Sequence, residues 1–127
     1  MGVLSVIAAA LAAWLFGAAW YGIMGRRWMG AAGLTEETLD RRNYAAFIGS
    51  LFAAVLVAGM MRHVFVTSGV DSPIEGALTG LGLGLFVASP WIATNYLFAQ
   101  RPASLILIDG LYATGGCTLI GLVLALL

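Results

Sequence analysis

The chain has 127 residues, of which 61% are hydrophobic and only 9% charged, and its formal net charge at pH 7 is zero. A soluble domain carries about a quarter charged residues, and one this small could not bury so much apolar surface in a single core. The balanced charge excludes the strong positive field of a nucleic-acid-binding protein. The composition therefore predicts a protein whose main partner is the lipid bilayer.

Four apolar stretches each approach the about 20 residues that a helix needs to cross a bilayer. They cover residues 3–24, 44–66, 74–98 and 103–127. The first stretch lacks a preceding basic segment and is too long for the apolar region of a signal peptide, so we interpret it as a retained span. We predict an all-α fold, a four-transmembrane-helix bundle in one integral membrane domain over residues 1–127.

The basic residues, all arginines, predict how the spans are oriented. Five lie in the first and third connections: Arg26, Arg27, Arg41, Arg42 and Arg101. The sixth, Arg62, lies near the end of the second span, so by the positive-inside rule these two connections face the cytoplasm and both termini lie outside. The outer surface is then expected to carry a polar cluster: Arg62, His63, Asp71 and Glu75.

The first connection contains signals for a short interfacial helix. Thr35 is typical of an N-cap residue, and Glu36 and Glu37 follow in the first turn, where the helix dipole favours acidic side chains. Glu37 and Arg41 have the spacing of a favourable pair along one helix face. We expect a short cytoplasmic helix that begins at Glu36 and leads into the second span.

Small residues in the third span predict a close contact between helices. Gly76, Gly80 and Gly84 form two overlapping G-x-x-x-G units, and Ala88 extends the stripe. Helices in lipid associate through small residues because these let two backbones approach. The first span carries a similar face: Ala9, Ala13 and Gly17. The pattern leaves open whether the stripe packs against another span or against a second subunit.

Pro90 interrupts the same span. It has no N–H to donate to the carbonyl of Phe86, so we expect a bend, and the hydroxyl of Ser89 could satisfy the freed backbone groups. A kink that improves packing and a functional hinge both fit this pattern.

A polar layer is predicted near the cytoplasmic ends of three spans. Asp109 lies about six residues into the fourth span, or about 9 Å along a helix. Asn95 follows Gly84 by eleven residues, close to three helical turns, so we place it on the glycine face. The candidate layer consists of Trp20, Tyr21, Asn95, Arg101, Asp109 and Tyr112.

A carboxylate inside a span must be paired, hydrogen-bonded or protonated, because a lone charge is costly in lipid. The candidate partners of Asp109 are Arg26, Arg101, Tyr21, Tyr112 and Asn95. The layer is either a polar clasp that fastens the fourth span to the first and third, or a site for a ligand.

Two stretches of the chain resemble a known family. "GAAWYGIMGRRWMGAAGLTEE" is similar to the G-x-x-W-Y…G-x-x-W-M…G-L-T-E opening of a bacterial membrane family designated domain of unknown function 1761. "NYLFAQRPASLILIDGLY" also resembles that family. The resemblance implies a four-helix integral membrane protein of the bacterial inner membrane, and it carries over no activity.

These observations favour a membrane protein without catalytic activity, packing through small-residue faces as a homo-oligomer or as an accessory subunit of a membrane complex. The alternative is binding or transport of a small molecule, an ion or a lipid headgroup at the layer around Asp109. The chain has no H-E-x-x-H, no G-x-S-x-G and no second intramembrane carboxylate, so we expect no enzyme. Cys117 has no neighbouring ligands, and we expect neither a metal nor a cofactor.

Overall fold

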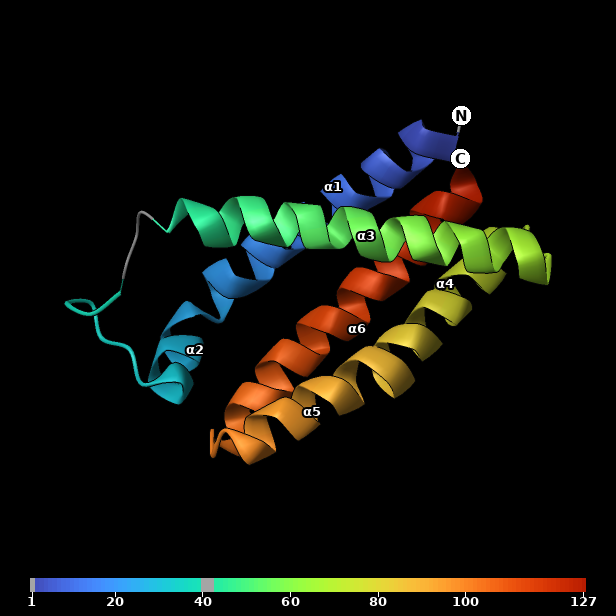
Figure 1. Ribbon diagram of the computed structural model, residues 1–127. Helices are drawn as coiled ribbons and strands as arrows, with labels where there is room; N and C mark the ends of the chain where they lie inside the picture. The colour runs from blue at the N-terminus through green and yellow to red at the C-terminus, as the bar shows by residue number, and fades with distance from the viewer. Residues whose placement is uncertain (1, 40–42) are drawn as a thin grey trace.

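The computed structural model describes residues 2–39 and 43–127, and within these ranges it is helical with no strand (Figure 1). The elements are α1 (Gly2–Ile23), α2 (Gly25–Ala32), α3 (Tyr44–Ser68), α4 (Pro73–Leu83), the π-helical turn η1 (Gly84–Ala88), α5 (Ser89–Phe98) and α6 (Ala103–Leu126). Four helical stretches are long and apolar enough to cross a membrane, with α4, η1 and α5 together forming the third. The all-α prediction and its four spans are confirmed.

Helix α6 is the centre of the bundle. It packs against α1 on one side and against α4, η1 and α5 on the other, while α3 crosses α1 and α6 obliquely (Figure 1). Of the most apolar part of α6, 39% is buried, compared with 17% for α3. Both chain termini lie at the same end of the bundle (Figure 1). Which end faces the cytoplasm stays a prediction.

The glycine stripe of α4 packs against α6 of the same chain. A Cβ added at Gly80 would lie 2.2 Å from the carbonyl oxygen of Cys117, and one at Gly76 would lie 2.5 Å from that of Gly121. On the opposite side, a Cβ at Gly121 would lie 2.1 Å from the carbonyl oxygen of Gly76. Only glycine permits this separation of the two backbones, so the stripe is an internal contact between the third and fourth spans.

The π-helical turn η1 changes the phase of the third span. The N–H of Ser89 donates to the carbonyl of Gly84, five residues earlier, just before Pro90. A π-turn holds about one residue more than an α-turn, and the Ser89 side chain is thereby directed toward α6. The Ser89 hydroxyl donates to the carbonyl of Gly110 in α6 at 3.1 Å. The expectation that the Ser89 hydroxyl satisfies freed backbone groups of its own span is corrected, because it bonds α6 instead. Ala88 is half-buried, and its place in the stripe stays a prediction.

The short helix between the first two spans exists, but it lies earlier in the chain than predicted. It is α2, and it ends at Gly33, whose φ of +75° is the left-handed conformation that glycine adopts freely. Thr35 and Thr38 instead close a turn in which their hydroxyls bond each other's backbone N–H groups, which competes with a helix. The expected pair of Glu37 with Arg41 lies outside the described residues.

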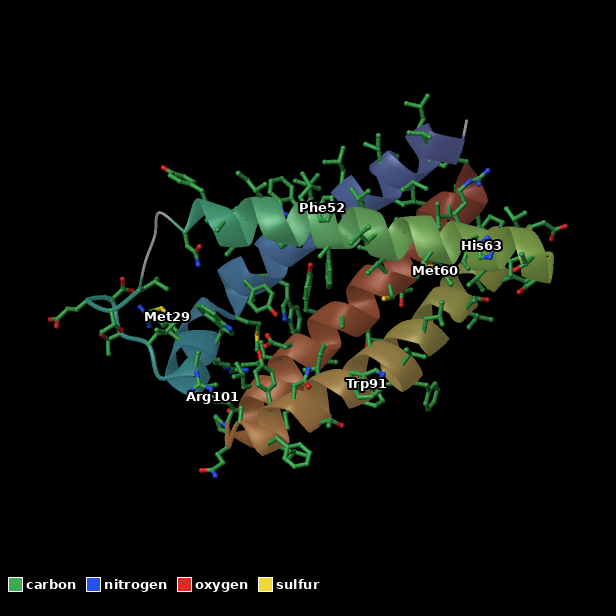
Figure 2. The ribbon with its side chains drawn as sticks, in the orientation of Figure 1. Met29, Phe52, Met60, His63, Trp91 and Arg101 are labelled. Atoms are coloured by element: carbon green, nitrogen blue, oxygen red, sulfur yellow. The ribbon has the colours of Figure 1, made fainter. Side chains whose placement is uncertain are left out.

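Helix α3 is attached mainly through its second half. Ala54, Ala58, Met61 and Phe65 are buried against the rest of the bundle. In its first half, the indole nitrogen of Trp14 donates to the carbonyl of Phe47 and lies 3.1 Å from the Ser50 hydroxyl. The opposite face points away from the bundle; Phe52 and Met60, at 64% and 62% exposed, mark it in Figure 2. The first half of α3 therefore lies on the surface of the bundle, exposed on most of its circumference.

Candidate functional site

The carboxylate of Asp109 joins three helices. The hydroxyl of Tyr21 in α1 donates to Oδ1, and the hydroxyl of Tyr96 in α5 donates to Oδ2. The Asp109 side chain is half-buried on α6, as are both tyrosines. Each carboxylate oxygen thus has a donor from a different neighbouring span.

The three side chains meet because each lies near the same end of the bundle. Tyr21 is close to the C-terminus of α1, which ends at Ile23, and Tyr96 is close to that of α5, which ends at Phe98. Asp109 lies in the second turn of α6, whose chain direction is opposite. Antiparallel neighbours therefore bring residues far apart in sequence to one depth in the membrane.

Aromatic rings surround this carboxylate. The ring of Tyr112 meets that of Tyr21 edge-on at 5.3 Å between centroids and stacks on Phe16 at 6.2 Å. Trp28 of α2 packs edge-on against Tyr21 at 6.1 Å. Gly17 makes room for Tyr112, since a Cβ at that position would lie 2.7 Å from its Cε1 atom. The small residue predicted for packing in the first span thus accommodates a side chain of the polar layer.

Two further hydrogen bonds join helices at the same end of the bundle. The indole nitrogen of Trp20 donates to the carbonyl of Ile108 at 3.1 Å, beside Asp109 in α6. The guanidinium of Arg101, between α5 and α6, donates to the carbonyl of Ala32 at 2.7 Å (Figure 2). Ala32 is the last residue of α2, where unpaired carbonyls favour a cation. Arg101 therefore holds α2 to the bundle end, and its hydrogen bond goes to that helix rather than to Asp109.

Asn95 does not join the layer. Its side chain is exposed, and Tyr96 occupies the expected position instead. Three turns of uninterrupted α-helix would bring Asn95 onto the glycine face, but η1 adds one residue, so the twelfth residue after Gly84 takes that place. Glycines at positions 80, 82 and 84, followed within the same span by Pro90, are the sequence signal that could have indicated this change.

Of the predicted layer, the structure brings together Trp20, Tyr21, Asp109 and Tyr112, with Arg101 at its edge. Two side chains that the sequence reasoning left out complete it: Tyr96 and Trp28. We call the set of Tyr21, Tyr96, Asp109 and Tyr112 the tyrosine clasp.

The tyrosine clasp holds its carboxylate with uncharged donors. A phenol donates one hydrogen bond but carries no positive charge, so the two tyrosines orient Asp109 without neutralising it. Each carboxylate oxygen can accept more than one hydrogen bond. The arrangement can therefore fasten helices, and it can also attract a cation. Within residues 2–39 and 43–127, no group of three His, Cys, Asp or Glu side chains is placed to hold a metal ion.

Four apolar helices, joined through an internal glycine contact and a tyrosine clasp, define a small multi-pass membrane protein. The chain belongs to the family described as "Protein of unknown function (DUF1761)", whose profile matches residues 4–125. The resemblance seen in the sequence is thereby confirmed. No curated protein matches the chain, and no solved structure does.

Proposed function

We propose that this is a non-catalytic protein of the bacterial inner membrane that works by associating with other membrane helices, as a homo-oligomer or as an accessory subunit of a membrane complex. Both termini would face the periplasm. The observation that carries the proposal is the first half of α3, which has a small-residue face that residues 2–39 and 43–127 leave uncovered.

That face is formed by Ala45, Gly49 and Ala53, spaced four residues apart and all exposed. A Cβ at Gly49 would meet no atom within 4 Å. The glycine stripe of α4, by contrast, is filled by α6 and offers nothing to a second subunit. Because small residues let membrane helices approach closely, α3 is the surface best suited to take a helix from outside.

Cysteine crosslinking tests this proposal. Ala53→Cys, in a Cys117→Ala background, should form disulfide-linked dimers in native membranes if α3 packs against its own copy. Leu111→Cys is the matched control, because this exposed residue lies at a similar depth on α6. A bulky Gly49→Leu change should abolish the crosslink.

If the protein is instead an accessory subunit, Ala53→Cys should crosslink to one partner protein and give a single adduct of constant mass, different from the mass of the dimer. A monomer with no crosslink in membranes and in mild detergent would contradict both forms of the proposal.

A second candidate function is binding or transport of a small cation, another small molecule or a lipid headgroup at Asp109. The observation that favours it is the set of neutral donors and aromatic rings around the carboxylate, since π faces attract organic ammonium groups. Thermal unfolding with added sodium or tetramethylammonium tests it: the cation should stabilise the native protein but not Asp109→Asn. A variant that loses stability while neither protein responds to either cation would favour a purely structural clasp.

A further inference from the structure

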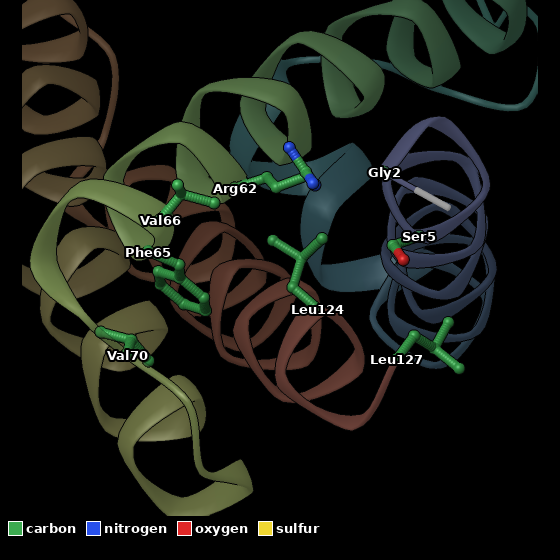
Figure 3. A pocket seen from close by; sticks show the side chains of 8 residues that line it. All are labelled: Gly2, Ser5, Arg62, Phe65, Val66, Val70, Leu124 and Leu127. Atoms are coloured by element: carbon green, nitrogen blue, oxygen red, sulfur yellow. The ribbon is translucent and has the colours of Figure 1, made fainter.

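A cavity of about 200 Å³ lies at the end of the bundle opposite the tyrosine clasp, between α1, α3 and α6 (Figure 3). Its lining residues are Gly2, Ser5, Arg62, Phe65, Val66, Val70, Leu124 and Leu127. Since a water molecule takes about 30 Å³ of liquid volume, the space fits a small polar group or a short length of hydrocarbon. Arg62 is the one charged side chain in this lining.

Arg62 reaches from α3 across to the first turn of α1 (Figure 3). A Cβ at Gly2 would lie 2.6 Å from its Cζ atom and 2.7 Å from Nη2, so glycine at this position lets the guanidinium lie over the helix. The side chain is exposed, and within residues 2–39 and 43–127 no hydrogen bond or ion pair occupies it. A guanidinium has five N–H donors in a planar fork that matches the oxygens of a phosphate.

The position of Arg62 along α3 places it at the depth where a lipid phosphate would lie. It precedes the end of α3 at Ser68 by six residues, or about 9 Å along the helix, which places a long side chain within reach of the headgroup region. Phe65 and Leu124 line the same cavity with apolar surface. A polar donor thus lies beside a hydrocarbon wall at the level where lipid phosphates and acyl chains meet.

The acidic side chains described at this end, Asp71 and Glu75, lie in the connection after α3 and at the start of α4. Asp71 and Glu75 are exposed and do not line the cavity, and neither does His63. Two carboxylates and one guanidinium at the same end of the bundle give no general attraction for anions. Recognition must therefore rest on direct contact with Arg62 and on the shape of the cavity.

We propose that this cavity binds the phosphate of a phospholipid, with the Arg62 guanidinium on the phosphate oxygens and the apolar wall against the start of an acyl chain. A free phosphate shares the headgroup chemistry but lacks the chain. The site is separate from the α3 face discussed above, so the two proposals can fail independently.

Native mass spectrometry of the full chain in a phosphate-free detergent tests the site, with dihexanoylphosphatidylglycerol and inorganic phosphate as separate probes. We expect Arg62→Gln to weaken lipid binding about tenfold or more, because it removes a charge-assisted pair of hydrogen bonds. Arg62→Lys should lose less, since it keeps the charge but not the planar fork. Arg27→Gln, at the other end of the bundle, is the charge-matched control and should leave binding unchanged.

Two further variants separate the headgroup from the chain. Leu124→Phe should fill the cavity and weaken binding of the lipid, with little effect on inorganic phosphate. Gly2→Ala should weaken both by displacing the guanidinium, and it keeps Arg62 in case Arg62→Gln fails to fold. Equal affinities for the lipid and for inorganic phosphate would show that the headgroup alone is recognised and would overturn the acyl-chain part. Equal lipid binding by the native protein, Arg62→Gln and Gly2→Ala would overturn the site.

Discussion

Helices α6 and α3 are of similar length and hydropathy, yet they are held in the bundle in different ways. Helix α6 touches α4 backbone to backbone and shares the tyrosine clasp with α1 and α5. Helix α3 is held by alanine contacts, two larger side chains and the indole of Trp14. Hydropathy places both helices in the membrane, but only small residues and polar groups specify what a membrane helix packs against. The packing of α1, α4, α5 and α6 against one another is therefore fixed by specific contacts, and α3 lies at the edge of this group.

The largest effect is expected where two backbones touch. Gly80→Ala places a Cβ 2.2 Å from a carbonyl oxygen of α6, which cannot move aside without separating the helices. We expect a loss of about 2–3 kcal/mol in unfolding free energy, the upper part of the range for overpacking. Gly82→Ala on the same helix is the control, because its Cβ meets no atom, and it should change stability by less than about 1 kcal/mol. Detergent-induced unfolding measures both, and equal losses would show that the contact is not specific.

A smaller loss should follow when the tyrosine clasp is opened. Tyr21→Phe or Tyr96→Phe removes one hydrogen bond to Asp109, and bonds between membrane helices contribute about 0.6 kcal/mol on average and up to about 1.7. The same change in an Asp109→Leu background should have almost no effect, because the acceptor is gone. A double-mutant cycle with no coupling energy would contradict the clasp.

Gly17→Ala should cost less than Gly80→Ala, because the obstacle is a side chain. The added Cβ would lie 2.7 Å from Cε1 of Tyr112, a ring that can tilt. We expect a loss of about 1 kcal/mol, at the low end for overpacking. The tyrosine signal in the near-ultraviolet circular dichroism spectrum should change as well. Gly22→Ala, in open space one turn later, should alter neither quantity.

The smallest global effect is expected at the edge of the bundle. Trp14→Phe removes the indole bond to the first half of α3, worth about 0.5 kcal/mol. Hydrogen exchange should rise in α3 near Phe47 and stay unchanged in α6. Trp91→Phe, an exposed residue of α5, should leave both helices unaffected. Faster hydrogen exchange in α6 than in α3 would contradict the conclusion that α6 is held more firmly than α3.

The sequence was sufficient for the spans and for the depth of the polar layer. Span length follows from hydropathy, and antiparallel spans must bring their ends to one level, so Tyr21 and Asp109 could be placed together. The glycine stripe predicted a close contact but not its partner, since close packing of Gly80 demands small neighbours and says nothing of their origin. That α6 supplies the partner is information held in the three-dimensional arrangement.

The errors share a cause, which is that helix phase and helix ends depend on single residues. Regular α-turns predict Asn95 at this position, and one π-turn is enough to replace it with Tyr96. The capping signals predict that the short connecting helix begins after Thr35, although Gly33 ends the helix before that point. The contact of Trp28 with the tyrosine clasp could not be predicted, because it depends on how α2 folds back toward Tyr21.

The π-turn at Gly84–Ala88 has a consequence for how the chain can change in length during evolution. It amounts to one inserted residue that the helix has absorbed. A one-residue deletion within it would restore regular α-turns and still leave Tyr96 directed at Asp109, because the residue count and the turn would change together. The same deletion two turns later would rotate the end of α5 by about 100° and break the clasp. We expect homologous chains to tolerate single-residue gaps at this turn and nowhere else between Gly76 and Tyr96.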